Sequence, residues 1–437
     1  YVTDDNPRNE NPKKIRNDIV KNISSNKYFN IGNRLKAIKN AIKNSTQNEL
    51  ILVAGKGHED KQIYKNKVLN ISDKKIIQSI KFKKKFLKKK KQNYLQNKFI
   101  LKKIIGNVKI DNFDGLATDS RLVKKDNLFL TIAGKNNDVY KYIPSALKKG
   151  AKYIASSKLI KKYKKKTIKI KNEILFLKQF AKFKREYSLA KVVAITGSAG
   201  KTSLKNLIKQ LLENFGKTYS SPKSFNNHFG VPISLSNLSA DTEYGVFEVG
   251  MSKAGEIKRL SKLVKPHIGI ITNIGEAHLE NFKNINEIAK TKAEIIETIR
   301  EDGTIILNRD DKYFNYLHKK AKNRKLKIIT FGQNIKSDIS LLKTIKINNL
   351  IKFIIKTKNE KINIEIKNIN IYNVLASIAV LQELNLNLNH IESYFKDFEP
   401  TEGRGKTHII KRYNKKFKLI DESYNANPLS VKNAING

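Results

Sequence analysis

The chain contains 437 residues, which is enough for about three domains of ordinary size. Its 88 lysine and arginine residues outnumber its 39 acidic residues and give a formal net charge of +49, and it contains no cysteine. The missing cysteines exclude disulfides, thiolate metal sites and cysteine nucleophiles, and no apolar run approaches the ~20 residues of a membrane span. We therefore expect a cytoplasmic protein without a membrane span.

The first predicted unit covers residues 1–80. Its pattern predicts a strand end at 1–3, helices over 12–23 and 34–44, and a strand over 50–54. Residues 81–97 then form a predicted lysine-rich linker, which contains the dense run Lys81–Lys91. We interpret this run as a solvated linker or surface helix, with a polyanion-binding patch as the alternative.

The second predicted unit covers residues 98–187. We expect strands over 128–132 and 152–155, and between them a helix over 142–149 that Gly150 closes. These elements indicate a small α/β domain.

The third predicted unit covers residues 188–405 and has the clearest pattern. A strand over 192–195 runs into a glycine turn and then into an amphipathic helix that Gly216 ends. Further strands are predicted over 246–249, 268–272, 305–307 and 327–330, and a helix over 285–299. Apolar strands that alternate with helices indicate a parallel sheet covered on both faces.

A last predicted unit, 406–437, begins with a strand over 417–420. The predicted fold class is therefore multidomain α/β. A central P-loop parallel sheet carries helices on both faces, and smaller α/β domains flank it.

A glycine-rich loop joins the strand at 192–195 to the following helix: Thr196, Gly197, Ser198, Ala199, Gly200, Lys201 and Thr202. In such loops, backbone N–H groups and the helix N-terminus bind phosphate. We expect Lys201 to reach the β- and γ-phosphates of a nucleotide, and the Thr202 hydroxyl to ligate Mg²⁺. Ile195 occupies the place of the first glycine in the standard pattern, so a plain glycine-rich turn stays an alternative.

Two further side chains follow the ends of predicted strands. Glu248 ends an apolar strand, and His278 follows the next strand along the chain. Because ligands collect at the carboxyl ends of parallel strands, the pair suggests a second Mg²⁺ site. Taken singly, a capping glutamate and a hydrogen-bonded loop histidine explain them equally well. Asn308 and Asp310 follow another strand and are candidates for contacts with a ribose or base.

Lys292 lies in the middle of the apolar stripe of the predicted helix 285–299, whereas Lys290 points away from it. A core-facing ammonium is costly unless it is paired, neutralised or chemically changed. A snorkelling lysine or a buried ion pair is the simpler alternative.

Taken together and in this order, these motifs resemble the Mur ligase family, whose members make amide bonds in peptidoglycan precursors with ATP. The match runs over 99–437, through 196–202, 226–232, 248–250, 272–278, 292–295, 403–404 and 421–428. The element at 421–428, together with 118–121, resembles the branch that adds D-alanyl-D-alanine to UDP-N-acetylmuramoyl-tripeptide.

The resemblance implies an ADP-forming ligase that uses ATP and Mg²⁺ and passes through an acyl phosphate. It implies catalytic roles for Lys201, His278 and Lys292, the last of them carbamylated. The implied metal ligands are Thr202, Glu248, His278 and Lys292. The implied nucleotide contacts outside the glycine-rich loop are Asn373, Arg404 and Asp421. The implied substrate contacts are Ser120, Arg121, Asn226, Tyr424 and Asn425.

The first unit resembles a different part of the same family, the C-terminal domain of the ligase that adds meso-diaminopimelate. By this resemblance, Arg8 binds a diaminopimelate carboxylate, while Glu59 and the Gly55 carbonyl accept from its amino group, beside Asp5 and Asn6. A zwitterion needs such a guanidinium fork and such acceptors. The resemblance implies that the chain is part of a fused bifunctional ligase, whose remainder would be its partner, and that 406–437 begins a truncated C-terminal ligase domain.

Two other functions stay open as alternatives. A folylpolyglutamate-synthase-like ligase shares the loop and the fold, but the element at 421–428 and the diaminopimelate unit argue against it. A nucleic-acid-binding P-loop ATPase accounts for the charge, because lysines neutralise phosphates. It does not account for Glu248, His278 and Lys292 together, so we do not expect a nucleic acid partner.

Overall fold

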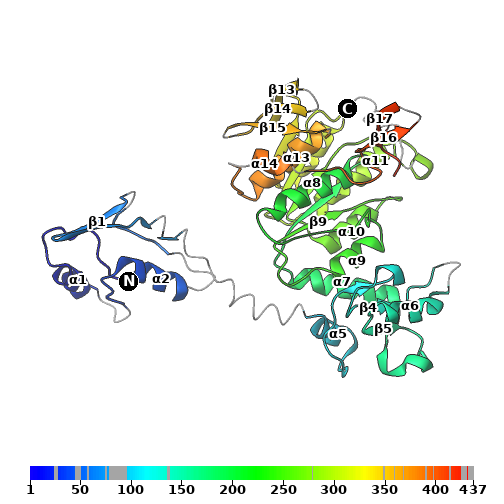
Figure 1. Ribbon diagram of the computed structural model, residues 1–437, viewed down its shortest axis with the longest axis horizontal. Coiled ribbons are helices and arrows are strands. Elements are labelled where there is room, and N and C mark those ends of the chain that lie inside the picture. Colours follow the sequence, from blue (N-terminus) through cyan, green and yellow to red (C-terminus); the bar gives the residue numbers. More distant parts are fainter. Residues whose placement is uncertain are drawn as a thin grey trace. The chain divides into compact units, whose positions relative to one another are not determined.

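The computed structural model describes the chain in two compact units, Tyr1–Leu87 and Lys88–Gly437 (Figure 1). The described residues are 1–23, 28–44, 51–56, 59–73, 76–77, 96–134, 138–277, 279–347, 350–358, 360–367, 369–388, 391–396, 398–412, 415–424 and 431. Predictions made for His278, for Asn425 and for the lysine-rich run therefore lie outside the described residues. No described helix is long and apolar enough to cross a membrane.

The first unit contains two helices and a hairpin. Its elements are α1 (Pro12–Lys21), α2 (Arg34–Asn44), β1 (Lys61–Tyr64) and β2 (Lys67–Asn70). Both predicted helices are confirmed, and Asn11 caps the first by accepting from the backbone N–H groups of its first turn. Ile38, Ile42 and Ile76 form a small core beneath α2.

The strand predicted over 50–54 was wrong in its described part, and the strand end at 1–3 is reduced to one isolated bridge between Val2 and Asn30. Residues 51–54 have no strand partner among the described residues, and the sheet of this unit contains only β1 and β2, which pair across a tight turn. Leu52 is 85% exposed. An apolar β-branched run forms a strand only where a neighbour can pair with it.

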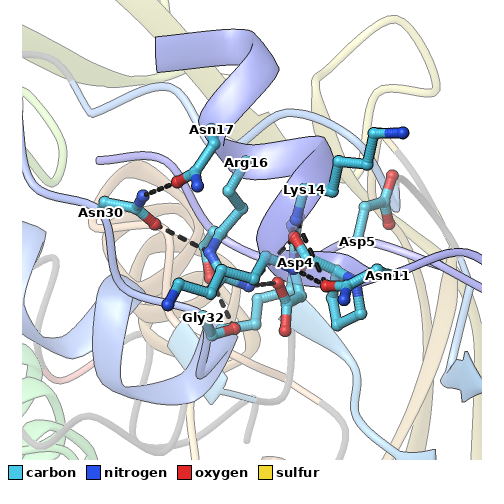
Figure 2. A network of polar contacts seen from close by, with 12 residues as sticks. Asp4, Asp5, Asn11, Lys14, Arg16, Asn17, Asn30 and Gly32 are labelled. Carbon is cyan, nitrogen blue, oxygen red and sulfur yellow. Dashed lines mark hydrogen bonds and ion pairs between the residues drawn. The ribbon is translucent and has the colours of Figure 1, made fainter.

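Buried polar contacts hold the first unit together. Figure 2 shows Arg16 of α1 between Asp4, with which it forms an ion pair, and Asn30, whose Oδ1 accepts from its Nε at 2.7 Å. The Tyr64 hydroxyl donates to Asp4 at 2.9 Å, and burial together with this contact raises the pKa of Tyr64 to about 12. Arg34 adds a buried two-point ion pair, since its Nε and Nη2 donate to the two Asp73 oxygens at 2.8 and 2.7 Å.

The second unit begins with a four-stranded parallel sheet in the order β3-β4-β5-β6. Its strands are β3 (Leu116–Ala117), β4 (Leu128–Leu130), β5 (Tyr153–Ser156) and β6 (Thr167–Lys169), and its helices are α5 (Asn97–Ile105), α6 (Ile143–Lys148) and α7 (Glu173–Tyr187). Phe176 and Phe180 of α7 pack into the core of this sheet. The two strands and the helix predicted here are therefore found: β4 is shorter than the predicted 128–132, and β5 is shifted by one residue from 152–155.

A nine-stranded sheet follows in the order β15-β14-β13-β12-β11-β10-β7-β9-β8. Its strands are β7 (Lys191–Thr196), β8 (Thr218–Ser220), β9 (Tyr244–Glu248), β10 (Ile268–Ile271), β11 (Thr304–Asn308), β12 (Lys327–Gly332), β13 (Ile339–Ile347), β14 (Leu350–Lys356) and β15 (Lys361–Ile366). The strands from β8 to β13 pair in parallel, whereas β14 and β15 add antiparallel. The sequence pattern missed β13 to β15 entirely.

Helices cover both faces of this sheet, as predicted. They are α8 (Lys201–Glu213), α9 (Gly230–Ser236), α10 (Glu256–Val264), α11 (Ile285–Lys292), α12 (Phe314–Asn323), α13 (Ile371–Glu383) and α14 (Ile391–Lys396). Alternate residues of β7 enter two different cores. Val193 and Ile195 pack with α8 and α13, whereas Val192 and Ala194 pack with α9 and α10.

The helix predicted over 285–299 was wrong in its second half. The α-helix ends at Lys292, and the chain continues as the 3₁₀-helix η5 (Ala293–Thr298). This tighter winding places the Glu294 carboxylate where it accepts from the backbone N–H groups of Gly255 and Lys258, at distances of 2.7 and 3.0 Å. The negative charge of Glu294 thereby caps the N-terminus of α10.

The remaining elements are short. The 3₁₀-helices are η1 (Ser120–Leu122), η2 (Val139–Tyr142), η3 (Lys161–Lys166) and η4 (Leu279–Asn281). A hairpin of β16 (Lys406–Arg412) and β17 (Lys415–Asp421) contains the strand predicted over 417–420.

We predict that Arg34→Met destabilises the first unit by about 3–5 kcal/mol, because it leaves the Asp73 carboxylate buried without its partner. Hydrogen exchange of the amides in this unit, in the full protein, measures the change. Lys36→Met is the matched control, since Lys36 is exposed on the same helix, and it should shift the stability by no more than about 0.5 kcal/mol. Equal effects of the two substitutions would contradict a stabilising role for the ion pair.

Candidate functional site

The loop between β7 and α8 requires glycine at two positions. Gly197 has φ +148°, and a Cβ there would lie 1.8 Å from Oγ1 of Thr272 on the neighbouring chain segment. Gly200 has φ +80°, directly before α8, and its Cβ would lie 3.3 Å from Oδ1 of Asn373. The backbone can therefore approach the end of β10 and the start of α13 only because side chains are absent.

The segment after β10 holds this loop in place. The Thr272 hydroxyl donates to the Ala199 carbonyl at 2.7 Å, and the Ala199 N–H donates to Oδ1 of Asn273 at 2.9 Å. The Ser198 hydroxyl donates to the Gly275 carbonyl at 2.7 Å and accepts from the Gly275 N–H at 2.8 Å. The loop is thus fixed in place directly before the N-terminus of α8, where backbone N–H groups favour anions.

Lys201 is the first residue of α8. Its ammonium donates to the Gly197 carbonyl at 2.7 Å, so the side chain folds back over the loop. Burial lowers the pKa of Lys201, Glu248 opposes this shift, and Arg404 adds to it. A lysine held over a glycine-rich loop in this way is placed to contact a bound phosphate.

Glu248, at the end of β9, lies beside the loop and is 2% exposed. The Thr202 hydroxyl donates to its Oε2 at 2.7 Å, and Nδ2 of Asn226 donates to its Oε1 at 2.7 Å. A hydroxyl and a carboxylate form the hard oxygen donor set that Mg²⁺ prefers. The residues present therefore fit a magnesium ion, although His278, the third predicted ligand, lies outside the described residues.

Lys292 is 3% exposed and Lys290 is exposed, as the helical pattern predicted. In the described part of the chain, no hydrogen bond or ion pair to the Lys292 ammonium is found, so the buried ion pair considered above is not found there. Burial lowers the pKa of Lys292 well below its ordinary value, and the nearby Lys201 lowers it further. This position therefore favours a neutral amine.

Arg404, just before the last predicted unit, contacts a segment that lies near the same loop. Arg404 donates from Nη2 to the Ser224 hydroxyl at 3.1 Å, and its guanidinium lies 4.1 Å from the centre of the Tyr424 ring. Asp421 accepts from the Gly403 N–H at 2.7 Å, which fixes the turn that carries Arg404. The structure thus brings Arg404, Tyr424 and Asp421 together. Ser224 connects them to Thr202, because the hydroxyl oxygens of Ser224 and Thr202 lie 3.4 Å apart.

Other predicted residues lie elsewhere or have structural partners. Ser120 is buried after β3, and Arg121 pairs with Asp119 at 2.8 Å, which lowers the pKa of Asp119. Among the described residues, no hydrogen bond or ion pair joins Ser120 or Arg121 to the glycine-rich loop. Asp310 accepts from the backbone N–H groups of Gln333 and Asn334, so its carboxylate fixes the turn after β12.

The residues of the predicted diaminopimelate pocket lie close together in the first unit. Asn6 donates to Glu59 at 2.5 Å, and a Cβ on Gly55 would lie 2.9 Å from the Asp5 carboxylate. Arg8 has φ +51° and donates from its backbone N–H to the Ile63 carbonyl. An unfavourable backbone conformation in a non-glycine residue is more frequent at binding sites than elsewhere.

A groove of about 860 Å³ lies between α7, α9 and α10. Its lining combines the apolar Pro232 and Leu260 with basic side chains that include Lys182, Lys253 and Arg259. His228, two residues after Asn226, also lines it. The basic side chains in its lining favour an anionic ligand.

Sequence reasoning missed two residues of this region, Lys205 and Ser224. Lys205 is 1% exposed on α8, and only its place at the edge of the apolar stripe could have indicated burial. Ser224 carries no local signal, because its contact with Arg404 joins residues far apart in the sequence.

Comparisons with known proteins give consistent matches. A sequence model of the Mur ligase middle domain matches residues 195–381. UDP-N-acetylmuramoyl-tripeptide--D-alanyl-D-alanine ligase of Rickettsia prowazekii is 35% identical over 329 residues, covering 74% of this chain and 72% of that protein. The ligase of the same name from Buchnera aphidicola subsp. Baizongia pistaciae is 32% identical, over 72% of this chain and 68% of its own length.

Solved structures show the same relationship. The crystal structure of MurF from Acinetobacter baumannii matches with a TM-score of 0.68 and 26% identity, over 78% of this chain and 75% of that chain. MurF ligase from Thermotoga maritima, solved in complex with ADP, shares the fold with a TM-score of 0.63 and 24% identity, over 74% of each chain.

We predict that Gly197→Ala lowers the apparent melting temperature of the second unit more than Gly255→Ala does. Both glycines have positive φ, but nothing lies within 4 Å of a Cβ on Gly255. The control therefore carries only the left-handed backbone strain of ~1–2 kcal/mol, whereas Gly197→Ala adds a clash with Thr272. Calorimetry of the full protein measures both shifts, and equal shifts would contradict the close approach described above.

Proposed function

The chain belongs to the Mur ligase family, and we propose that it joins D-alanyl-D-alanine to UDP-N-acetylmuramoyl-tripeptide in an ATP-dependent, ADP-forming reaction. The observation that carries this proposal is the position of Lys201, Thr202 and Glu248 around one glycine-rich loop at the carboxyl edge of a parallel sheet. The relatives named above support the choice of substrates. Because one of those substrates is a nucleotide-linked intermediate of precursor synthesis, we also propose a cytoplasmic location.

The proposed reaction has two steps. The terminal carboxylate of the tripeptide attacks the γ-phosphorus of ATP, which forms an acyl phosphate and releases ADP. The amine of D-alanyl-D-alanine then attacks the acyl carbon through a tetrahedral intermediate, phosphate leaves, and the nitrogen loses a proton. Both steps bring negative groups together, so positioned positive charge is the main requirement.

The residues around the loop have distinct proposed roles. Lys201 exchanges its contacts with the loop carbonyls for contacts with the β- and γ-phosphates. Thr202 and Glu248, together with His278, would hold magnesium, which when bound neutralises phosphate charge. Asn226 orients the Glu248 carboxylate through its hydrogen bond of 2.7 Å, and we assign it in addition a contact with the substrate.

The remaining predicted contacts keep their proposed partners. We assign Asn373, Arg404 and Asp421 to the nucleotide, because Asn373 lies against Gly200 and Arg404 lies near Lys201. Ser120, Arg121, Tyr424 and Asn425 are assigned to the other substrates. The basic groove between α7 and α10 supports this reading, since a UDP-linked peptide is a polyanion.

For the first unit we propose binding of a diaminopimelate-like zwitterion. The Asn6–Glu59 contact and the approach of Gly55 to Asp5 place acceptors on one side, and the exposed Arg8 supplies a guanidinium. Such a chain would carry parts of two consecutive ligases.

We predict that the purified protein releases phosphate from ATP and forms the amide only when UDP-N-acetylmuramoyl-tripeptide and D-alanyl-D-alanine are both present. Lys201→Ala should reduce this rate by about 10²–10³, because the lost contact acts on developing phosphate charge. Lys209→Ala is the control, since Lys209 lies on the surface of the same helix and pairs with Glu213. Phosphate release that depends on single-stranded DNA instead would favour the ATPase alternative and refute the proposal.

We also propose that Lys292 becomes a carbamate. Its neutral amine would attack carbon dioxide to form a new N–C bond and release one proton, and the product is an anion. This chemistry needs an amine with a lowered pKa, which the buried position of Lys292 supplies. The anion could then help Glu248 and His278 to hold a second magnesium ion.

We predict that Lys292→Ala abolishes ligation and that short carboxylates such as formate or acetate restore part of it. Lys290→Ala should leave the rate nearly unchanged, because Lys290 is exposed and points away from the core. A carbamate signal in ¹³C NMR after incubation with labelled bicarbonate provides a readout independent of activity. Its absence from the wild-type protein, or its persistence in Lys292→Ala, would refute the modification at this lysine.

A further inference from the structure

Lys205 is a buried cation that the proposed reaction does not use. It lies on α8 one turn after Lys201, and its side chain is among the largest that are fully buried. Burial lowers the pKa of Lys205 to about 8, although the Glu248 charge opposes this shift. Within the described ranges, no carboxylate forms an ion pair with it. Burying an ammonium without an ion-pair partner is costly, so the presence of a lysine at this position needs an explanation.

Those hydrogen bonds go to one short loop. The Lys205 ammonium donates to the backbone carbonyl of Ser221 at 2.7 Å and also to that of Lys223. We call residues 221–226 the bridge loop. Lys223 has φ +45°, a conformation that residues with a side chain rarely adopt, so this loop needs contacts from outside to keep its shape.

The bridge loop in turn contacts three groups of the candidate site. Ser224 accepts from Arg404 at 3.1 Å, and its hydroxyl oxygen lies 3.4 Å from that of Thr202. Asn226 donates to Glu248 at 2.7 Å. The Ser221 hydroxyl accepts from the backbone N–H of Glu248 at 3.2 Å. The loop therefore sets the positions of the proposed metal ligands and of Arg404 at the same time.

We propose that Lys205 is a positioning residue, whose ammonium holds the bridge loop so that Ser224 and Asn226 orient Thr202, Arg404 and Glu248 for the magnesium nucleotide. This inference rests on the proposed function but adds a residue that touches neither nucleotide nor substrate. An ammonium suits the task because its compact donors can serve two carbonyls from within a closed space. The guanidinium of arginine is planar and larger, so we do not expect it to make the same two contacts in this closed space.

The test compares Lys205→Met with Lys209→Met, because Lys209 lies on the surface of the same helix and pairs with Glu213 at 3.0 Å. The primary measurement is the Kd of a non-hydrolysable ATP analogue by calorimetry, across a range of magnesium concentrations. We expect Lys205→Met to weaken binding at least tenfold at low magnesium and to raise the magnesium concentration needed for half-maximal binding. Lys209→Met should change neither. Because no ligation is needed, the outcome is independent of whether the proposed reaction occurs.

A second substitution separates positioning from simple loss of stability. Lys223→Gly removes the backbone strain of the bridge loop, so in the Lys205→Met background it should recover part of the magnesium-dependent binding. Asn226→Ala alone should reproduce the raised magnesium requirement, which keeps the test valid if Lys205→Met fails to fold. A wild-type magnesium requirement in a folded Lys205→Met variant would overturn the proposal, and so would a wild-type requirement in Asn226→Ala if Lys205→Met does not fold.

Discussion

A single buried carboxylate, that of Glu248, organises the candidate site. It is 2% exposed and accepts hydrogen bonds from Thr202 on α8 and from Asn226 on the bridge loop. Burying a carboxylate in such a place is costly unless donors and cations compensate its lost hydration. The contact of α8 with β9, the course of the bridge loop and the burial of Lys205 all contribute to that compensation.

Cations in this region nevertheless outnumber the carboxylate. Glu248 acts on both Lys201 and Lys205, Arg404 lowers the pKa of each, and Lys201 in turn lowers the pKa of Lys292. An excess of positive charge in a poorly hydrated site is unfavourable until an anion enters. A bound triphosphate would remove this repulsion, so the local arrangement, more than the total charge of +49, favours a polyanionic ligand.

The parts of this fold that could be predicted are those with a strong local signal. The apolar strand before Gly197 and the periodic helix after it identified the centre of the sheet, and the apolar stripe identified Lys292 as buried. Lys205 lies at the edge of its stripe, where periodicity alone does not distinguish a buried lysine from a snorkelling one.

The parts that could not be predicted depend on distant partners. Strand β15 alternates isoleucine with polar residues, yet its pairing with β14 follows from tertiary packing. The run at 51–54 is as apolar as a strand but lacks a neighbour among the described residues. The contact between Ser224 and Arg404 spans a sequence separation of 180, so no pattern within a single segment can reveal it.

The charges of Lys201 and Lys292 are coupled, and this coupling gives the proposed carbamate a second consequence. The positive charge of Lys201 lowers the pKa of Lys292 and so disfavours its charged form. Conversion of Lys292 to an anion would replace that repulsion with attraction and would raise the pKa of Lys201. Lys201 would then keep its proton while it contacts the phosphates, which is the state that electrostatic stabilisation requires. On this argument, the modification supplies a metal ligand and also preserves the charge of the lysine that binds ATP.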